Sequence, residues 1–141
     1  MCSYDLSRFH KAQEIFYPHA LREIKRGRKQ THWMWFIFPQ LRALGHSPKA
    51  VYYGIESIEE AKAYLDDPVL RARLYEISEA LLATGESDPV LVMGEIDALK
   101  LCSSMTLFWK ASDGEEIFRR VLDQFYGGKE DMYTLSILSE T

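Results

Sequence analysis

The stretch from Asp97 to Ser104 brings together three residue types that can do chemistry. Asp97, Lys100 and Ser104 follow one another at intervals of three and four residues, so a helix would place them on one face. A carboxylate in such a group can stabilise positive charge on a sugar or activate water, as in glycoside hydrolysis. A lysine near a serine can also serve nucleophilic catalysis. The alternative is a capped helix with an ordinary surface ion pair, worth about 0.2–1 kcal/mol.

A second segment, "THWMWFIFPQ" (31–40), combines aromatic rings with polar residues at both ends. A buried core segment is the usual outcome for such a run of rings. A binding site is the other interpretation, in which Trp33 or Trp35 stacks on a base and Gln40 hydrogen-bonds to the edge of a ligand. His32 has a pKa range suited to proton transfer, or else it is a structural histidine.

A basic cluster comes directly before this aromatic segment. Its residues would suit the C-terminal turn of a helix, where cations interact favourably with the helix dipole and stay solvated. In a binding site, Arg28 and Lys29 would instead hold a phosphate group. The cluster consists of Arg22, Lys25, Arg26, Arg28 and Lys29.

Length and composition restrict the class of protein. The chain has 141 residues, of which 47% are hydrophobic and 27% charged, as expected for one globular domain spanning residues 1–141. Its two cysteines, Cys2 and Cys102, form no disulfide framework and have no metal-ligand spacing. Free thiols and the lack of an apolar leader favour the cytoplasm. We expect no metal, no cofactor and no association with membranes.

The distribution of charge points to a small anionic ligand. Residues 1–70 contain ten lysines and arginines against eight acidic residues, whereas residues 71–141 contain seven against thirteen. A net charge of -4 with one local basic cluster argues against general nucleic-acid binding. It leaves room for a small anionic or nucleotide-like partner at the cluster. The sequence gives no indication of the oligomeric state.

The elements that must position these residues are short helices. Helix-capping residues, prolines and glycines recur along the chain, and strand-like alternation is absent. The sequence therefore predicts a mainly α fold of about eight short helices around one core. Short strands remain an alternative for "WMWFIF" and "SMTLFW", because short apolar runs are ambiguous. The expected helices are 5–16, 18–26, 57–65, 69–83, 89–93, one from Asp97 into "LKLCSSMTLFW", one from Asp113 to 126, and one from Asp131 to 138.

Five segments spread over nearly the whole chain stand out: "DLSRFHKAQ", "GRKQTHWMWFIFPQLRALGHSP", "EAKAYLDDPVLRARL", "DALKLCSSMTLF" and "GGKEDMYTLSIL". Through these segments the chain resembles a bacterial family catalogued only as domain of unknown function 1810, whose members are sometimes mislabelled calpastatin. The resemblance implies a mainly helical fold with no settled activity.

A second resemblance rests on "AYLDDPVLRARLYEISEALLATGESDPVLVMGEID", about a quarter of the chain. This segment is similar to the NADAR proteins, N-glycosidases linked to ADP-ribose and riboflavin-pathway metabolites. The resemblance implies a role for Asp97 as the acidic residue. Where the NADAR pattern has a lysine before the aromatic residue, this chain has Ala63, with Lys62 one position earlier.

Three hypotheses follow. The first is an enzyme, an N-glycosidase or similar hydrolase, that acts on a nucleotide or an ADP-ribose-type ligand. Asp97 would act on the sugar, and the sugar hydroxyls would be positioned by Lys100, Ser104, Thr106 and Gln40. The second is a non-enzymatic module in which the same arginine and tryptophan residues bind a small ligand or a protein. The third is a buried hydrogen-bond network without a cavity, formed by Asp97, Lys100, His32 and Gln40.

Overall fold

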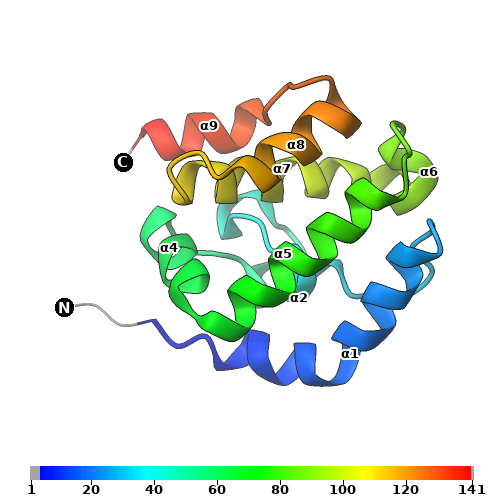
Figure 1. Cartoon of the computed structure of the whole chain (residues 1–141). Coiled ribbons are helices and arrows are strands. Elements are labelled where there is room, and N and C mark those ends of the chain that lie inside the picture. The colour runs from blue at the N-terminus through cyan, green and yellow to red at the C-terminus, as the bar shows by residue number, and fades with distance from the viewer. Residues whose placement is uncertain (1–3, 141) are drawn as a thin grey trace.

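Helices make up most of the computed structural model, which describes residues 4–140 (Figure 1). The predicted mainly α fold is confirmed. None of the helices in this range is both long enough and apolar enough to span a membrane. Of the two predicted free thiols, Cys102 is free and Cys2 lies outside the described range. The elements are α1 (Ser7–Lys25), α2 (Met34–Ile37), the 3-10 turn η1 (Arg42–Leu44), α3 (Pro48–Tyr53), α4 (Ile58–Asp66), α5 (Pro68–Ala83), α6 (Pro89–Met93), α7 (Glu95–Ala111), α8 (Glu116–Tyr126) and α9 (Met132–Ser139).

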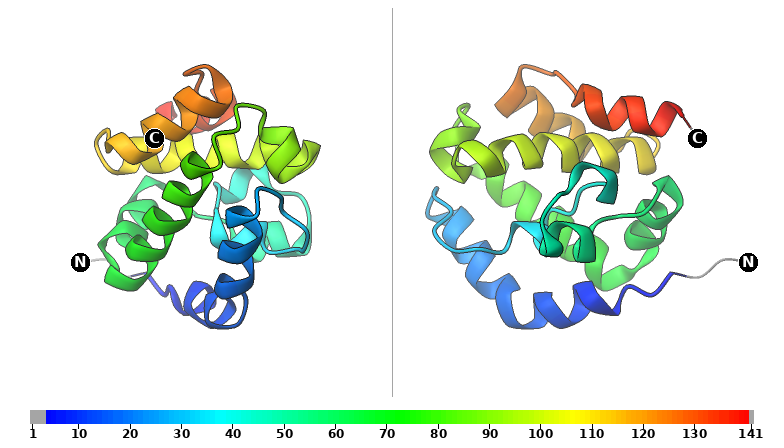
Figure 2. Two further views of the ribbon diagram at one scale, coloured as in Figure 1. Left: turned by 45° about the vertical axis from the view of Figure 1, so that its right-hand side comes forward. Right: turned by 180° about the vertical axis from the view of Figure 1, so that it is seen from behind.

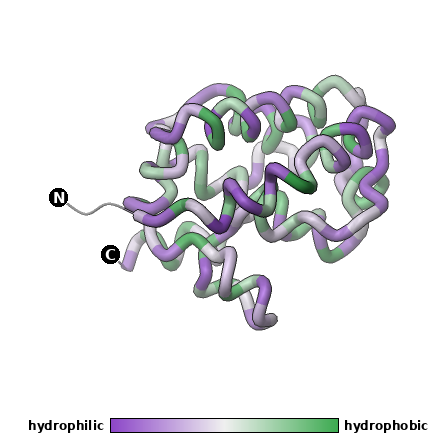
Figure 3. Tube along the Cα trace, turned by 90° about the horizontal axis from the view of Figure 1, so that it is seen from below, coloured by the Kyte–Doolittle hydropathy of each residue, from purple (hydrophilic) through white to green (hydrophobic). Residues whose placement is uncertain are grey.

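The first helix, α1, continues through Pro18. The sequence predicted two helices that meet at this proline, and that prediction is wrong. A proline inside a helix removes one backbone hydrogen bond and costs about 3 kcal/mol. Tertiary packing offsets the cost, because α1 buries Phe9 and Ala12 before the proline and Ala20 and Ile24 after it. Figure 3 shows hydrophilic and hydrophobic residues interspersed along the helices, as expected for helices with one buried face.

Replacement of Pro18 by alanine is expected to raise the free energy of unfolding by about 2–3 kcal/mol. Alanine supplies the missing N–H, whereas the greater freedom of the unfolded chain cancels about 0.4–1 kcal/mol of the gain. Urea denaturation measures the change. Pro89→Ala is the matched control, because Pro89 occupies the first turn of α6, where a proline fits the helix. A lower stability of the Pro18 variant would show that the ring contributes more through packing than it costs.

Aspartate–proline pairs begin two of the helices, as predicted. Asp67 accepts hydrogen bonds from the first N–H groups of α5, and Asp88 accepts one from Val90 in α6. The predicted caps Ser57 of α4 and Asp131 of α9 are also confirmed. These signals act over three residues, so the local sequence suffices to predict them.

Three predicted caps are wrong. Asp5 bonds to the N–H of Ser7, but the residue that precedes α1 is Leu6, whose side chain makes no cap. Asp97 lies inside the first turn of α7, which begins earlier because Gly94 adopts a positive φ. Asp113 sits in the turn before α8 with a φ of 57°. Acidic residues suit the whole region around a helix start, so their presence does not fix the first residue.

Both segments for which strands remained an alternative are helical: "WMWFIF" contains α2, and "SMTLFW" belongs to α7. In the described part of the chain, extended backbone pairs only at an isolated bridge between Leu41 and Ile55. The bridge closes the base of an excursion, residues 42–54, which we call the cover segment. It contains η1 and α3, two elements that the sequence analysis did not predict. Seen from behind, residues 41–56 lie between α1 and α7, on the face opposite α5 (Figure 2).

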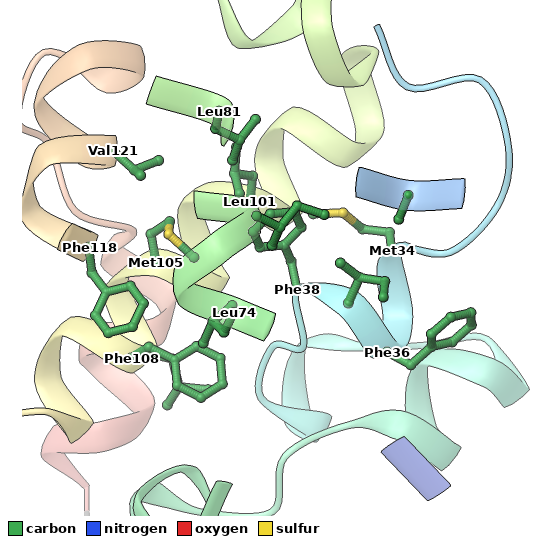
Figure 4. Packing of buried hydrophobic residues seen from close by; sticks show 14 of the residues in the cluster. Met34, Phe36, Phe38, Leu74, Leu81, Leu101, Met105, Phe108, Phe118 and Val121 are labelled. Carbon is green, nitrogen blue, oxygen red and sulfur yellow. The ribbon is translucent and has the colours of Figure 1, made fainter. Parts of the chain in front are cut away.

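The central helix is α7, which contacts α4, α6, α8 and α9. Its residues from Ser103 to Phe108 are all buried, so it buries nearly its whole circumference. Figure 4 shows Leu101, Met105 and Phe108 of this helix packed among side chains from α5 and α8, with Phe38 entering the same core. This packing fixes the position and rotation of α7, and therefore the direction in which the face with Asp97, Lys100 and Ser104 points.

Candidate functional site

The aromatic segment and α7 meet at a small pocket, which we call the Trp35 pocket. Its volume is about 10 Å³, which is room for about one water molecule. Apolar side chains form most of its wall, and Gln40 and Lys100 supply polar groups. The lining residues are Met34, Trp35, Phe38, Gln40, Ala50, Gly54 and Lys100.

Two ammonium groups lie near the ring of Trp35. The Nζ atom of Lys49 is 4.9 Å from the ring centroid, and that of Lys100 is 5.6 Å away. Both distances are within the range of cation–π attraction. Lys49 belongs to the cover segment and Lys100 to α7, so cations from two separate elements converge on one indole. The surroundings of Trp35 are therefore positively charged.

The indole N–H of Trp35 is a buried donor that has no hydrogen-bond partner within the described residues. The ring itself is only partly buried. Leaving a buried polar group unpaired costs about 1–3 kcal/mol. A donor of this kind beside two ammonium groups is suited to an acceptor that carries negative charge.

Asp97 and Lys100 are joined by a third residue, Lys29. The Nζ atom of Lys29 lies 2.9 Å from one carboxylate oxygen of Asp97, and that of Lys100 lies 3.9 Å from the other. The side chain of Lys29 is only 6% exposed and also donates to the carbonyl oxygen of Thr31. Lys29 is thus occupied by the protein, and Lys100 is the ammonium group that reaches the pocket.

A buried carboxylate, Glu23, holds the chain between α1 and α2. It accepts hydrogen bonds from the backbone N–H groups of Gln30 and Thr31, the hydroxyl of Thr31 and the indole N–H of Trp33. Burial raises the pKa of Glu23, but these hydrogen bonds outweigh burial and lower it to about 2. The ionised carboxylate therefore fixes the loop that leads to Trp35.

The cover segment forms one side of the Trp35 pocket through Ala50 and Gly54. Two backbone hydrogen bonds close its base: the N–H of Arg42 donates to Ile55, and the N–H of Ile55 donates to Gln40. The carbonyl oxygen of Gly54 also accepts from the guanidinium groups of Arg8 and Arg42, and the ring of Tyr53 packs against Phe9 and Phe36. The cover segment is therefore held at its C-terminal end as well as at its base.

The structure brings some of the predicted site residues together and separates others. Trp35, Gln40 and Lys100 line one pocket, and Asp97 is paired with Lys100 beside it. The remaining candidates lie elsewhere. His32 and Arg28 are exposed, and Trp33 is fully buried. Ser104 is buried, and its hydroxyl has no hydrogen-bond partner among residues 4–140. Thr106 accepts from the N–H of Asp131 before α9.

Lys49 and Glu23 also belong to this site, and their roles were not predicted from the sequence. A buried tryptophan indole N–H needs a hydrogen-bond acceptor, and this need could have pointed to an acceptor for Trp33. The acceptor is Glu23, which lies ten residues earlier in the chain, in α1. Lys49 gives no local signal, because only the fold of the cover segment brings it to Trp35. Within residues 4–140, no three histidine, cysteine or acidic side chains gather as metal ligands would.

Comparisons with known proteins match the chain to a family model and to a solved structure. Residues 3–138 match the model of a family described as protein of unknown function (DUF1810). The chain is similar to the crystal structure of the conserved hypothetical protein Rv1873 from Mycobacterium tuberculosis, with 47% sequence identity and a TM-score of 0.95. The match covers 98% of this chain and 99% of that one. A comparison with curated proteins found no match. Neither match supports the resemblance to NADAR proteins.

Proposed function

The chain belongs to the DUF1810 family, and we propose that it binds a small anionic, nucleotide-like molecule at the Trp35 pocket. The unpaired indole N–H of Trp35 carries the proposal. It is a buried donor that lies next to two ammonium groups. An acidic group of the ligand would accept from this donor and interact with Lys49 and Lys100.

The apolar wall supports a ligand with a planar part. Met34, Trp35 and Phe38 offer surface for stacking, and Gln40 offers an amide that can bond to a ring edge. Such a combination of apolar walls with a few polar groups is typical of small-molecule sites. A nucleotide is larger than the present pocket, so its binding requires the cover segment to move outward.

The test is the change in melting temperature with ADP-ribose, AMP, NAD and flavin precursors, with inorganic phosphate as the simplest anion. A ligand present at about 100 times its Kd is expected to raise the Tm by roughly 5–10 °C. The double variant Lys49→Gln/Lys100→Gln should lose most of this rise, and Trp35→Phe should weaken it. Lys25→Gln is the control, because Lys25 is an exposed lysine at the end of α1. If no compound shifts the Tm at millimolar concentration, the proposal fails.

Hydrolysis of an N-glycosidic bond is the second candidate function. One observation favours it: Asp97 is paired with Lys100, a pocket residue, and Lys29 holds its carboxylate in place. If hydrolysis occurs, chromatography of the reaction mixture will show release of the free base, and Asp97→Asn will abolish it. Binding without release of a base would identify a non-enzymatic ligand-binding module.

A further inference from the structure

A second depression lies between α4 and α9 and shares no lining residue with the Trp35 pocket. Its volume is about 520 Å³, within the range typical of small-molecule sites. We call it the α4–α9 groove. In Figure 1, α4 and the C-terminal end of α9 lie on the same side of the molecule. The groove is lined by Ile58, Lys62, Lys110, Leu135, Leu138 and Ser139.

The groove combines an aliphatic floor with two cations. Ile58, Leu135 and Leu138 come from the two flanking helices and are partly buried. Lys62 and Lys110 are exposed and come from α4 and the end of α7. No carboxylate in residues 4–140 forms an ion pair with either lysine, and no acidic side chain is among the lining residues. The ammonium group of Lys110 also lies 5.0 Å from the centroid of the Trp109 ring. The groove thus offers apolar surface beside two exposed lysines.

We propose that the α4–α9 groove binds a free fatty carboxylate. The alkyl chain would lie on Ile58, Leu135 and Leu138, and the carboxylate would meet the ammonium groups of Lys62 and Lys110. The size of the groove favours this ligand over a protein, because a stable protein interface uses about 20–30 residues on each side, whereas six residues of the described range line the groove. Charge favours a carboxylate over a neutral or cationic amphiphile.

The expected affinity depends on chain length. Burial of one methylene group is worth about 0.8 kcal/mol, which corresponds to about a fourfold change in Kd. Each added methylene should therefore lower the Kd by up to about fourfold until the groove is filled, after which the Kd should level off. Each exposed lysine should lower the Kd about two- to fivefold. Added salt should weaken this electrostatic part of the binding.

The experiment is calorimetric titration of the full chain with octanoate, decanoate, dodecanoate and tetradecanoate below their micelle concentrations. Dodecanol and dodecyltrimethylammonium are the neutral and cationic comparisons. The variant Lys62→Gln/Lys110→Gln should raise the Kd of dodecanoate about four- to twentyfold. The control Lys11→Gln/Lys25→Gln, which changes exposed lysines of α1, should leave it unchanged. Leu135→Ser should raise the Kd of dodecanoate more than that of octanoate.

Each of the following results would overturn the inference: a Kd independent of chain length, equal binding of the cationic amphiphile, or a dodecanoate Kd that Lys62→Gln/Lys110→Gln leaves unchanged. Loss of dodecanoate binding in Lys49→Gln/Lys100→Gln, with the groove variants unaffected, would place the ligand at the Trp35 pocket and also refute it. Circular dichroism and the Tm of each variant show whether it folds. Binding of an acidic peptide but not of dodecanoate would identify a protein-docking groove and refute the inference.

Discussion

Replacement of Glu23 by alanine is expected to lower the free energy of unfolding by about 3 kcal/mol. The side chain is 8% exposed, and its loss leaves four donors without their acceptor. Each buried donor left unpaired costs about 1–3 kcal/mol, and some will regain water. Glu14→Ala, on the exposed surface of the same helix, is the control and should change stability by less than about 0.5 kcal/mol.

The same carboxylate should make the protein sensitive to acid. The pKa of Glu23 is about 2 in the folded protein against an ordinary value of 4.5. Because the folded value is the lower one, the stabilisation is complete above pH 4.5 and is lost as the pH falls toward 2. Each unit of difference between the folded and unfolded pKa is worth about 1.4 kcal/mol. The difference between 4.5 and about 2 therefore corresponds to a loss of about 3 kcal/mol in the free energy of unfolding.

Urea denaturation at pH 6 and at pH 3 measures this effect. Glu23→Gln should be less stable than the natural chain at pH 6, and the difference should shrink at pH 3. An equal difference between the two proteins at both pH values would contradict the assigned role of the charge.

Replacement of Gly54 by alanine is expected to destabilise the fold by about 2–3 kcal/mol and to displace the cover segment. A Cβ atom at this position would lie 2.4 Å from the Cα of Arg42 and 2.8 Å from the carbonyl oxygen of Ala50. Both are backbone atoms, so no flexible side chain can move aside. Gly54 has a φ of -61° and a ψ of 142°, which alanine adopts freely. The loss of stability in Gly54→Ala therefore comes from steric clash and not from backbone strain.

Hydrogen exchange distinguishes displacement of the cover segment from a general loss of stability. The amides of Arg42 and Ile55, which close its base, should exchange faster in Gly54→Ala than the amides of α7. Gly27→Ala is the matched control, because Gly27 has a φ of 83° but no neighbour within 4 Å. That variant should cost about 1–2 kcal/mol through backbone strain and leave the cover segment protected. Unchanged exchange at Ile55 in Gly54→Ala would show that the close contact is relieved elsewhere.

Local signals predicted much of the fold. Asp67 and Asp88 begin helices because a capping carboxylate acts on the next three residues. Pro18 misled the prediction, because its tolerance inside α1 depends on packing against distant helices. The 3-10 turn and α3 were missed, although Ser47 and Pro48 form a cap and first turn like those recognised elsewhere.

The candidate site was predictable only in part. Its two walls, the aromatic segment 31–40 and the first half of α7, stood out in the sequence. Each contains polar side chains among apolar ones, and a buried polar side chain requires a hydrogen-bond partner. The sequence could not show that Lys29 pairs with Asp97, since that contact joins residues 68 positions apart. The sequence also could not show that Lys49 lies near Trp35, since the hydrophobic pattern of the cover segment has no clear helical or strand period.

Arg8, near the start of α1, connects that helix to the wall of the Trp35 pocket, because Gly54 lines the pocket. Its guanidinium group donates to the carbonyl oxygens of Asp5 and Gly54 and to the carboxylate of Glu60. It thereby couples the first turn of α1 and the first turn of α4 to the end of the cover segment. A lysine cannot reproduce these three bonds, because its ammonium is a point charge without the planar fork of arginine. If the proposed ligand displaces Gly54, it would break the bond from Arg8 to Gly54, and the beginning of α1 would lose one of its anchors.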